Sequence, residues 1–234
     1  MDEEGGIVSV VSDGVSRITF NRPERRNAFT AAGYRRFAAL LRAAAADPGV
    51  AVVVVNGAGA AFCSGVDRAA LADLQAGGSS EELGGTFVEL LEALATFPKP
   101  LIGAVHGYAI GFGMTMLLHF DLVLVESGTR MRLPFVELGV APEAGSSYLL
   151  PARVGAQTAA WLLMSGDWVD APTAVELGLA WREYPAPVLE QGLAVARQLA
   201  SGSPAALEAA KRLLVAGRLE PVLAAFDRER RTAV

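Results

Sequence analysis

One carboxylate in this chain stands in a context that suits proton transfer. Glu143 follows Pro142 and precedes the small residues of Ala144–Ser147, and the apolar residue Phe135 lies eight positions before it. An apolar neighbour keeps water away from a carboxylate and raises its pKa, which makes it a stronger base. Taken alone, however, an acid at the start of a helix is favoured by the helix dipole and needs no chemical role.

Two glycine-rich turns could present backbone N–H groups to a negatively charged oxygen. Ala61–Asp67 (AFCSGVD) follows the apolar run Val50–Val55, and Gly107–Gly113 (GYAIGFG) follows the apolar run Leu101–Val105. Glycine lets the backbone approach a ligand closely, and each fixed N–H donor stabilises an enolate oxygen by about 3–4 kcal/mol. Each turn by itself is equally consistent with an ordinary strand-to-helix connection.

Two adjacent arginines near the N-terminus could meet phosphate. Arg25 and Arg26 lie in the segment Asn21–Ala28 (NRPERRNA), and the guanidinium group suits phosphate recognition. Exposed arginines are common, so the residues alone leave this interpretation open.

These segments together resemble the enoyl-CoA hydratase/isomerase (crotonase) superfamily. The matching stretches are NRPERRNA (21–28), AFCSGVD (61–67), HGYAIGFGMTM (106–116) and LPFVELGVAPEAGSSYLL (133–150). The last stretch is most similar to the Δ3,Δ2-enoyl-CoA isomerase branch, whose P-E-x-x-S-S-Y pattern is matched by Pro142–Tyr148. The resemblance covers about residues 8 to 231.

The resemblance implies a role for each matched position. The backbone N–H groups of Val66 and Phe112 would form an oxyanion hole for the thioester oxygen, and Glu143 would carry the proton. The residues implied to line the site for CoA or the acyl chain are Arg25, Arg26, Ala28, Ala61, Ser64, Gly65, Asp67, Gly111, Thr115, Pro134, Phe135 and Leu138.

Two of these positions separate the possible reactions. Hydratases of the superfamily hold water between two glutamates, and the corresponding residues here are Thr115 and Phe135. The resemblance therefore favours an enoyl-CoA isomerase that moves a 3-double bond to the 2-position through Glu143. The alternatives are another CoA-thioester reaction, including hydratase-type activity, and an acyl-CoA-binding protein with little catalysis.

Other chemically active residues carry smaller expectations. Glu137, if its segment is extended, shares a face with Phe135 and could be a displaced acid, although a solvated or ion-paired side chain explains it better. His106 and His119 are expected to be structural, and Cys63 has no evident basic partner that would make it a nucleophile. Because the chain has two histidines and one cysteine, no metal site is expected, and the resemblance implies no cofactor beyond the CoA of the substrate.

A nicotinamide-binding site is a competing interpretation. The segment Gly57–Phe62 nearly matches the G-x-G-x-x-G fingerprint after the run Val50–Val55. Phe62 stands where the third glycine belongs, however, and no acid ends a strand about 20 residues later. The match is therefore weak evidence.

Composition indicates a single globular domain. The chain has 234 residues, 52% of them apolar and 19% charged, and a formal net charge of −5. This acidic balance disfavours nucleic acid as the main partner, because nucleic-acid binding depends on cations that neutralise phosphates. A single cysteine excludes an internal disulfide, and the acidic N-terminus lacks signal-peptide features, so we expect a cytoplasmic protein. The apolar stretch Leu101–Val125 is interrupted by glycine, histidine and aspartate, which favours buried strands and a helix over a membrane span.

Hydrophobic periodicity predicts an α/β protein with a largely parallel sheet. The predicted strands are Ile7–Val11, Val15–Phe20, Val50–Val55, Leu101–Val105 and Leu122–Val125. The predicted helices are residues 30–46, Gly111–His119, Ala156–Ser165, Ala171–Leu177, Val188–Leu199, Pro204–Ala216 and Pro221–Arg231, and Gln75–Gly85 is predicted to be a surface loop.

The resemblance refines this to a crotonase-like ββα spiral core with a helical C-terminal region. The expected division is residues 1–190 for the core and its acyl-CoA site and residues 191–234 for the C-terminal helices. Relatives usually continue for about 20 further residues with an aromatic-containing helix that can cover the acyl-CoA, so the resemblance implies a C-terminal helical region shorter than usual in the family. The resemblance also implies a homotrimer or a dimer of trimers.

Overall fold

A twisted, mostly parallel sheet forms the centre of the fold. The computed structural model describes residues 4–67, 69–70 and 80–232. Within them, the main sheet has the strand order β1-β2-β3-β4-β6-β9, with β1 antiparallel to β2 and the other neighbours parallel. Its strands are β1 (Ile7–Ser12), β2 (Val15–Phe20), β3 (Val52–Gly57), β4 (Leu101–Val105), β6 (Leu122–Glu126) and β9 (Arg182–Tyr184).

A smaller sheet lies beside it and carries one of the glycine-rich turns. In this sheet β5 pairs in parallel with β7, and β7 pairs antiparallel with β8. Its strands are β5 (Tyr108–Ile110), β7 (Arg130–Arg132) and β8 (Val169–Asp170).

Helices cover both faces of the main sheet and fill the C-terminal part of the chain. The α-helices are α1 (Ala31–Ala46), α3 (Ser80–Ala95), α4 (Phe112–Thr115), α5 (Phe135–Leu138), α6 (Ser146–Val154), α7 (Ala156–Ser165), α8 (Ala171–Glu176), α9 (Val188–Ala200), α10 (Pro204–Ala216) and α11 (Leu219–Thr232). The 3-10 helices are η1 (Glu4–Gly6), η2 (Pro23–Arg25) and η3 (Met116–His119). No helix among the described residues is long and apolar enough to cross a membrane.

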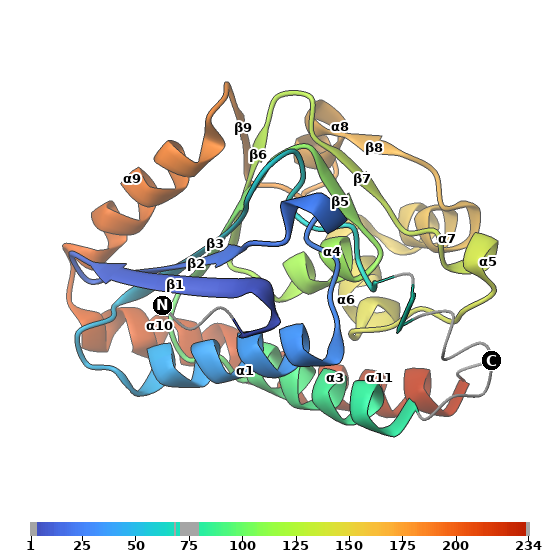
Figure 1. Ribbon diagram of the computed structural model, residues 1–234, viewed down its shortest axis with the longest axis horizontal. Coiled ribbons are helices and arrows are strands. Elements are labelled where there is room, and N and C mark those ends of the chain that lie inside the picture. The colour runs from blue at the N-terminus through green and yellow to red at the C-terminus, as the bar shows by residue number, and fades with distance from the viewer. Residues whose placement is uncertain (1–3, 68, 71–79, 233–234) are drawn as a thin grey trace.

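The alternation of side chains along β3 explains why both faces are covered. Val53 and Val55 belong to the larger core cluster with α1 and α3, whereas Val52 and Val54 pack with α9 on the opposite face. All four valines are fully buried, as expected of a parallel strand between two layers. α1, α3 and α11 lie side by side in one layer (Figure 1).

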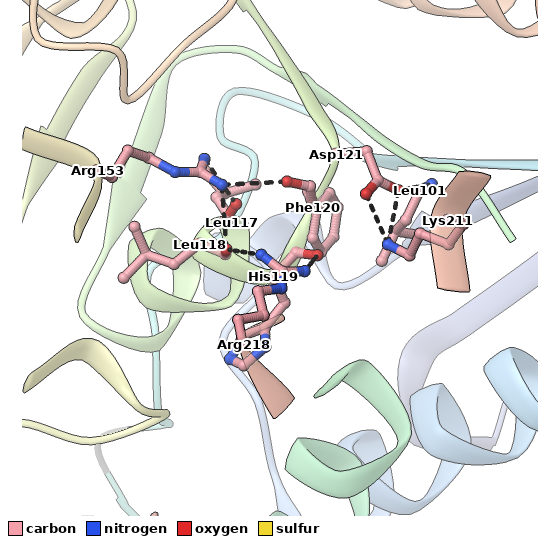
Figure 2. Close-up of polar contacts among 9 residues, drawn as sticks. All are labelled: Leu101, Leu117, Leu118, His119, Phe120, Asp121, Arg153, Lys211 and Arg218. Carbon is pink, nitrogen blue, oxygen red and sulfur yellow. Dashed lines mark hydrogen bonds and ion pairs between the residues drawn. The ribbon is translucent and has the colours of Figure 1, made fainter. Parts of the chain in front are cut away.

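Buried polar contacts hold the C-terminal helices against this core (Figure 2). Lys211 of α10 donates to both oxygens of Asp121 at 2.7 Å. Arg153 of α6 and Arg218, between α10 and α11, donate to carbonyl oxygens at the end of η3. The last carbonyls of a helix lack partners within it, so these arginines act as its C-terminal cap.

Most predicted elements are confirmed, with boundaries shifted by one to two residues at some ends. Thr30, at the start of the predicted helix 30–46, caps α1, because its hydroxyl accepts a hydrogen bond from the backbone N–H of Gly33. The predicted helix Gly111–His119 is divided into α4 and η3, and Leu101–Val125 forms strands and short helices as expected. The division at residue 190 falls within α9 and stays a prediction.

One sequence-based expectation is wrong, and the conditions for two disfavoured interpretations are not met. Residues 80–85 of the predicted loop Gln75–Gly85 begin α3, while its remainder lies outside the described residues. Phe135 and Glu137 belong to α5, so they do not share a face as they would in an extended segment. No helix opens at Gly57–Phe62, because the chain there enters an irregular turn, so the dinucleotide fingerprint is not realised.

Candidate active site

The two glycine-rich turns lie directly against each other. Cys63 donates its N–H to the carbonyl of Tyr108 at 3.1 Å and accepts from the N–H of Ile110 at 3.0 Å. The same pairing forms an isolated bridge between Cys63 and Ala109. Backbone hydrogen bonds therefore fix the turn after β3 relative to the turn that leads into α4.

Glycine is required where these turns meet. Gly65 has φ of +92°, and a Cβ atom on it would lie 2.8 Å from the Ile110 carbonyl oxygen and 3.5 Å from the Phe112 nitrogen. A Cβ atom on Gly113 would overlap the carbonyl oxygen of Cys63. The backbone around Gly65 is thus adjacent to the amide of Phe112. A larger residue at position 65 would push these two segments apart.

Both predicted oxyanion-hole amides are free of backbone acceptors in the part of the chain that the structure describes. Phe112 is the first residue of α4, so its N–H has no partner within the helix. In the parallel bridge between Phe29 and Val66, Phe29 bonds to Gly65 and Asp67, which leaves the Val66 N–H directed away from Phe29. The assignment of Val66 and Phe112 as paired donors stays a prediction.

The Glu143 carboxyl group is buried and singly hydrogen-bonded. The Thr115 hydroxyl of α4 donates to Glu143 Oε1 at 2.6 Å. The residue is half-buried as a whole, but its Oε2 atom is inaccessible and has no hydrogen-bond partner among the described residues. One oxygen is therefore held in place while the other is available for a proton.

This environment raises the pKa of the Glu143 carboxyl group. Burial raises its pKa from the ordinary value of 4.5 to about 8, the Thr115 hydrogen bond opposes that rise, and the nearby charge of Glu229 adds to it. A carboxyl group that titrates near neutral pH can both accept and release a proton, as general acid–base catalysis requires.

Neither acid of the hydratase pair is present at the two expected positions. Thr115 is fully buried and bonded to Glu143, and Phe135 is 4% exposed. Glu137 is exposed and forms an ion pair with Arg132, which confirms the ion-paired interpretation and excludes it as a displaced acid. Of the other predicted substrate contacts in this region, Pro134 is buried and Leu138 is largely exposed.

The two histidines and the single cysteine are not placed to act as bases or nucleophiles. His119 is fully buried, and burial lowers its pKa to about 3, so the imidazole is neutral. Its Nε2 lies 2.9 Å from the Ala144 carbonyl, which can only accept, so Nε2 carries the proton. Burial raises the pKa of Cys63 to about 12, which excludes a thiolate nucleophile. His106 is hydrogen-bonded to the Gly59 carbonyl, so both histidines are structural as expected.

The residues implied to bind CoA gather along one edge of the first turn. Ser64 donates its N–H to the Arg26 carbonyl at 3.0 Å, and the Asn27 side chain donates to the Ala61 carbonyl at 2.7 Å. The Arg25 and Arg26 side chains are exposed, whereas Asp67 is paired with Arg22. Ala28 and Ala61 are buried and so offer backbone groups more than side-chain surface. These contacts with CoA stay predictions.

Two contacts to the segment around Glu143 were missed from the sequence. For the Thr115 hydrogen bond, the available signal was a hydroxyl residue at one of the two positions where the resemblance expects an acid. Glu229 accepts hydrogen bonds from the N–H groups of Gly145 and Ser147. The only feature of the sequence that pointed to this contact was a carboxylate on the apolar face of the last helix. No group of three or more metal-ligating side chains was found among the described residues.

Comparison with known proteins identifies the family. The model of the enoyl-CoA hydratase/isomerase family matches residues 11–232. The chain is 36% identical over 198 residues to the 2,3-dehydroadipyl-CoA hydratase of Escherichia coli (strain K12), covering 84% of this chain and 76% of that protein. It is 34% identical over 190 residues to enoyl-CoA delta isomerase 2 of Rattus norvegicus, covering 80% of this chain and 48% of the isomerase.

A solved structure shows the same architecture. The enoyl-CoA hydratase/isomerase from Pseudoalteromonas atlantica T6c superimposes with a TM-score of 0.88 at 33% identity, covering 96% of this chain and 88% of that chain. The crotonase-like α/β fold expected from the sequence is therefore confirmed.

Proposed function

Because the chain belongs to the enoyl-CoA hydratase/isomerase family, we propose that it isomerises 3-enoyl-CoA to 2-enoyl-CoA with Glu143 as the single base. The observation that carries this proposal is the buried Glu143 carboxyl group, which is bonded through one oxygen to Thr115, one of the two positions where a hydratase would hold an acid. A reaction that needs one proton carrier fits such a site better than one that must activate water.

The proposed reaction proceeds through a dienolate. The Glu143 carboxylate takes a proton from C2, and the electrons pass into the thioester carbonyl, whose oxygen accepts hydrogen bonds from the Val66 and Phe112 amides. The protonated Glu143 then delivers that proton to C4, which places the double bond between C2 and C3. The carboxylate is regenerated, and no cofactor beyond the CoA of the substrate takes part.

The pKa of Glu143 suits this cycle. A base that removes a proton next to a carbonyl gains strength as its pKa rises, but it must still be ionised for part of the time at the working pH. With a pKa of about 8, Glu143 in the free protein passes from mostly protonated to mostly ionised as the pH rises through that value. We therefore expect kcat/KM to increase with pH and to level off above about pH 8.

Hydration of 2-enoyl-CoA is the second candidate. It is favoured by the similarity to the hydratase of Escherichia coli, and the same two amides would stabilise the enolate of water addition. The absence of a carboxylate at Thr115 and Phe135 weighs against it, because a single acid must then both position and deprotonate the water.

Replacing Glu143 tests the proposal. Glu143→Gln keeps the shape and the hydrogen bond to Thr115 but removes basicity, so isomerisation of 3-enoyl-CoA should fall about 10²–10⁴-fold. Glu137→Gln is the matched control, because its exposed acid should leave the rate unchanged. Purified variants are assayed with 3-enoyl-CoA for conjugation and with 2-enoyl-CoA for hydration. Efficient hydration by the wild type, or full isomerase activity in Glu143→Gln, would contradict the proposal.

The acyl-CoA thioester is the partner that family membership supports. We further propose the homotrimer or dimer of trimers implied by the resemblance as the functional assembly. Light scattering of the purified protein measures its mass in solution and tests that assembly.

A further inference from the structure

The last helix packs directly on the segment that carries the base. Val222, Phe226 and Glu229 recur at the spacing of one helical face on α11. A Cβ atom on Gly145 would lie 2.9 Å from the Phe226 ring and 3.5 Å from a Val222 methyl group. This face of α11 therefore contacts the backbone two residues after Glu143.

Glu229 completes this contact with two hydrogen bonds. Its Oε2 accepts from the N–H of Gly145 at 2.7 Å, and its Oε1 accepts from the N–H of Ser147 at 2.9 Å. Both amides belong to the start of α6, where no acceptor exists within the helix. A carboxylate more than 80 residues away in sequence thus caps α6 from outside.

The segment between Glu143 and α6 needs external support. Ala144 has φ of +60° and Gly145 has φ of +72°, so two consecutive residues are left-handed. This conformation costs a non-glycine residue about 1–2 kcal/mol. The Ala144 carbonyl accepts a hydrogen bond from His119, so His119 and Glu229 both bind the backbone of the same turn.

We propose that Glu229 is a positioning residue for Glu143: by binding the Gly145 and Ser147 amides, it holds the left-handed turn that aims the Glu143 carboxyl group into the site. The proposal rests on the proposed function, in which Glu143 is the base. Glu229 itself does not touch the Glu143 carboxyl group or the reacting atoms.

The charges around Glu143 make this role measurable. The charge of Glu229 helps to raise the pKa of Glu143, after burial itself. Tyr34 and Cys63 also interact electrostatically with Glu143, but burial raises the pKa of each, so both are neutral near pH 7. The cations Arg153, Arg218 and Lys211 act electrostatically on His119, which bonds to the Ala144 carbonyl. Removal of the Glu229 charge should therefore lower the pKa of Glu143.

Glu229→Gln tests the proposal, with Asp227→Asn as the matched control. Both substitutions remove one negative charge from α11, but Asp227 is exposed and forms ion pairs with Arg230 and Arg231 of its own helix. The titration of Glu143 is followed by NMR in glutamate-labelled protein, with Glu143→Gln used to assign the signal. Steady-state rates with 3-enoyl-CoA are measured in parallel.

In Glu229→Gln we expect kcat to fall about 10-fold with KM changed less than about twofold, because binding surfaces stay in place while the base is misaligned. The midpoint of the Glu143 titration should move to lower pH, because a nearby negative charge is removed. Asp227→Asn should change neither. A purely structural role for Glu229 would lower the melting temperature and leave kcat unchanged, so a wild-type kcat in folded Glu229→Gln overturns the proposal.

The proposal can still be tested if the wild type lacks isomerase activity or if Glu229→Gln does not fold. If the wild type does not isomerise 3-enoyl-CoA, the proposed function fails, but the NMR titration still tests the coupling of Glu229 to Glu143. If Glu229→Gln does not fold, hydrogen exchange in the wild type decides, since first-turn amides are protected only by an external acceptor. Protection of both the Gly145 and Ser147 amides supports the proposal, and exchange at unprotected rates overturns it.

Discussion

Glu143 illustrates how a single hydroxyl group can tune a buried acid. Burial alone would keep the carboxyl group protonated to high pH, and the Thr115 hydroxyl lowers the pKa again by donating to Oε1. The final value of about 8 is a balance between these opposing effects. Thr115 is therefore more than an inert replacement for the acid of a hydratase.

Removal of that hydroxyl should shift the pH dependence of the reaction. In Thr115→Val the ionised form of Glu143 loses its donor, so its pKa should rise and a smaller fraction should be ionised at neutral pH. The midpoint of kcat/KM, measured between about pH 6 and pH 10, should move upward. Thr129→Val is the control, because that buried threonine bonds to the Val105 carbonyl instead. A midpoint that stays at the wild-type pH would show that the Thr115 bond does not stabilise the ionised base.

At the scale of elements, the site depends on how closely two turns approach. The turn after β3 and the turn before α4 share backbone hydrogen bonds through Cys63, and glycine at Gly65 and Gly113 permits their contact. The approach of these turns brings the backbone at Gly65 next to the Phe112 amide. Their distance, more than any side chain, controls the geometry of the proposed oxyanion hole.

A pair of alanine substitutions separates this contact from backbone strain. Gly65 and Gly128 have similar positive φ values, +92° and +86°, so alanine at either should cost about 1–2 kcal/mol of stability. Only at Gly65 would the new Cβ meet the Ile110 carbonyl, whereas nothing lies within 4 Å at Gly128. We expect kcat/KM to fall at least about 10-fold in Gly65→Ala and to remain near wild type in Gly128→Ala. Urea unfolding measures the stability of both variants, and kcat/KM measures their activity. Equal kcat/KM values in the two variants would contradict the proposed role of this contact.

At the scale of the whole molecule, the C-terminal helices are tied to the core by buried polar groups. Lys211 is 3% exposed and pairs with Asp121, which also accepts from the N–H of Leu101 at the start of β4. α10 is thus anchored where the chain passes from η3 to β6, and α11 continues from it to the Glu143 segment. The stability of the C-terminal helices and the geometry of the site are therefore linked.

Breaking this anchor should be costly. Lys211→Met leaves the Asp121 charge without its cation, and removal of one partner of a buried pair costs about 3–5 kcal/mol. The partial exposure of Asp121 and its bond to Leu101 favour the lower end of that range. Arg42→Met is the control, since the Arg42–Glu89 pair is about half exposed and should contribute at most about 1 kcal/mol. The free energy of unfolding in urea measures both, and similar losses would contradict the importance of the buried anchor.

The sequence by itself determined the elements whose causes are local, together with the family. The Thr30 cap of α1 and the strand from the valine run at 52–55 follow from neighbouring residues, and α5 was missed because a short helix carries little periodic signal. The positions Val66, Phe112 and Glu143 could be assigned from the sequence because the motifs of the family keep their spacing even where neighbouring residues differ.

Only the tertiary structure decided how Glu143 is held. Thr115 is 28 residues from Glu143 in sequence, and Glu229 is 84 residues from Gly145, yet both contribute directly to the surroundings of one carboxyl group. Glu137, much nearer in sequence, points to solvent because α5 rotates it away from Phe135. Hydrogen bonds and burial act through distances in space, and those distances exist only after the sheet and the C-terminal helices have packed together.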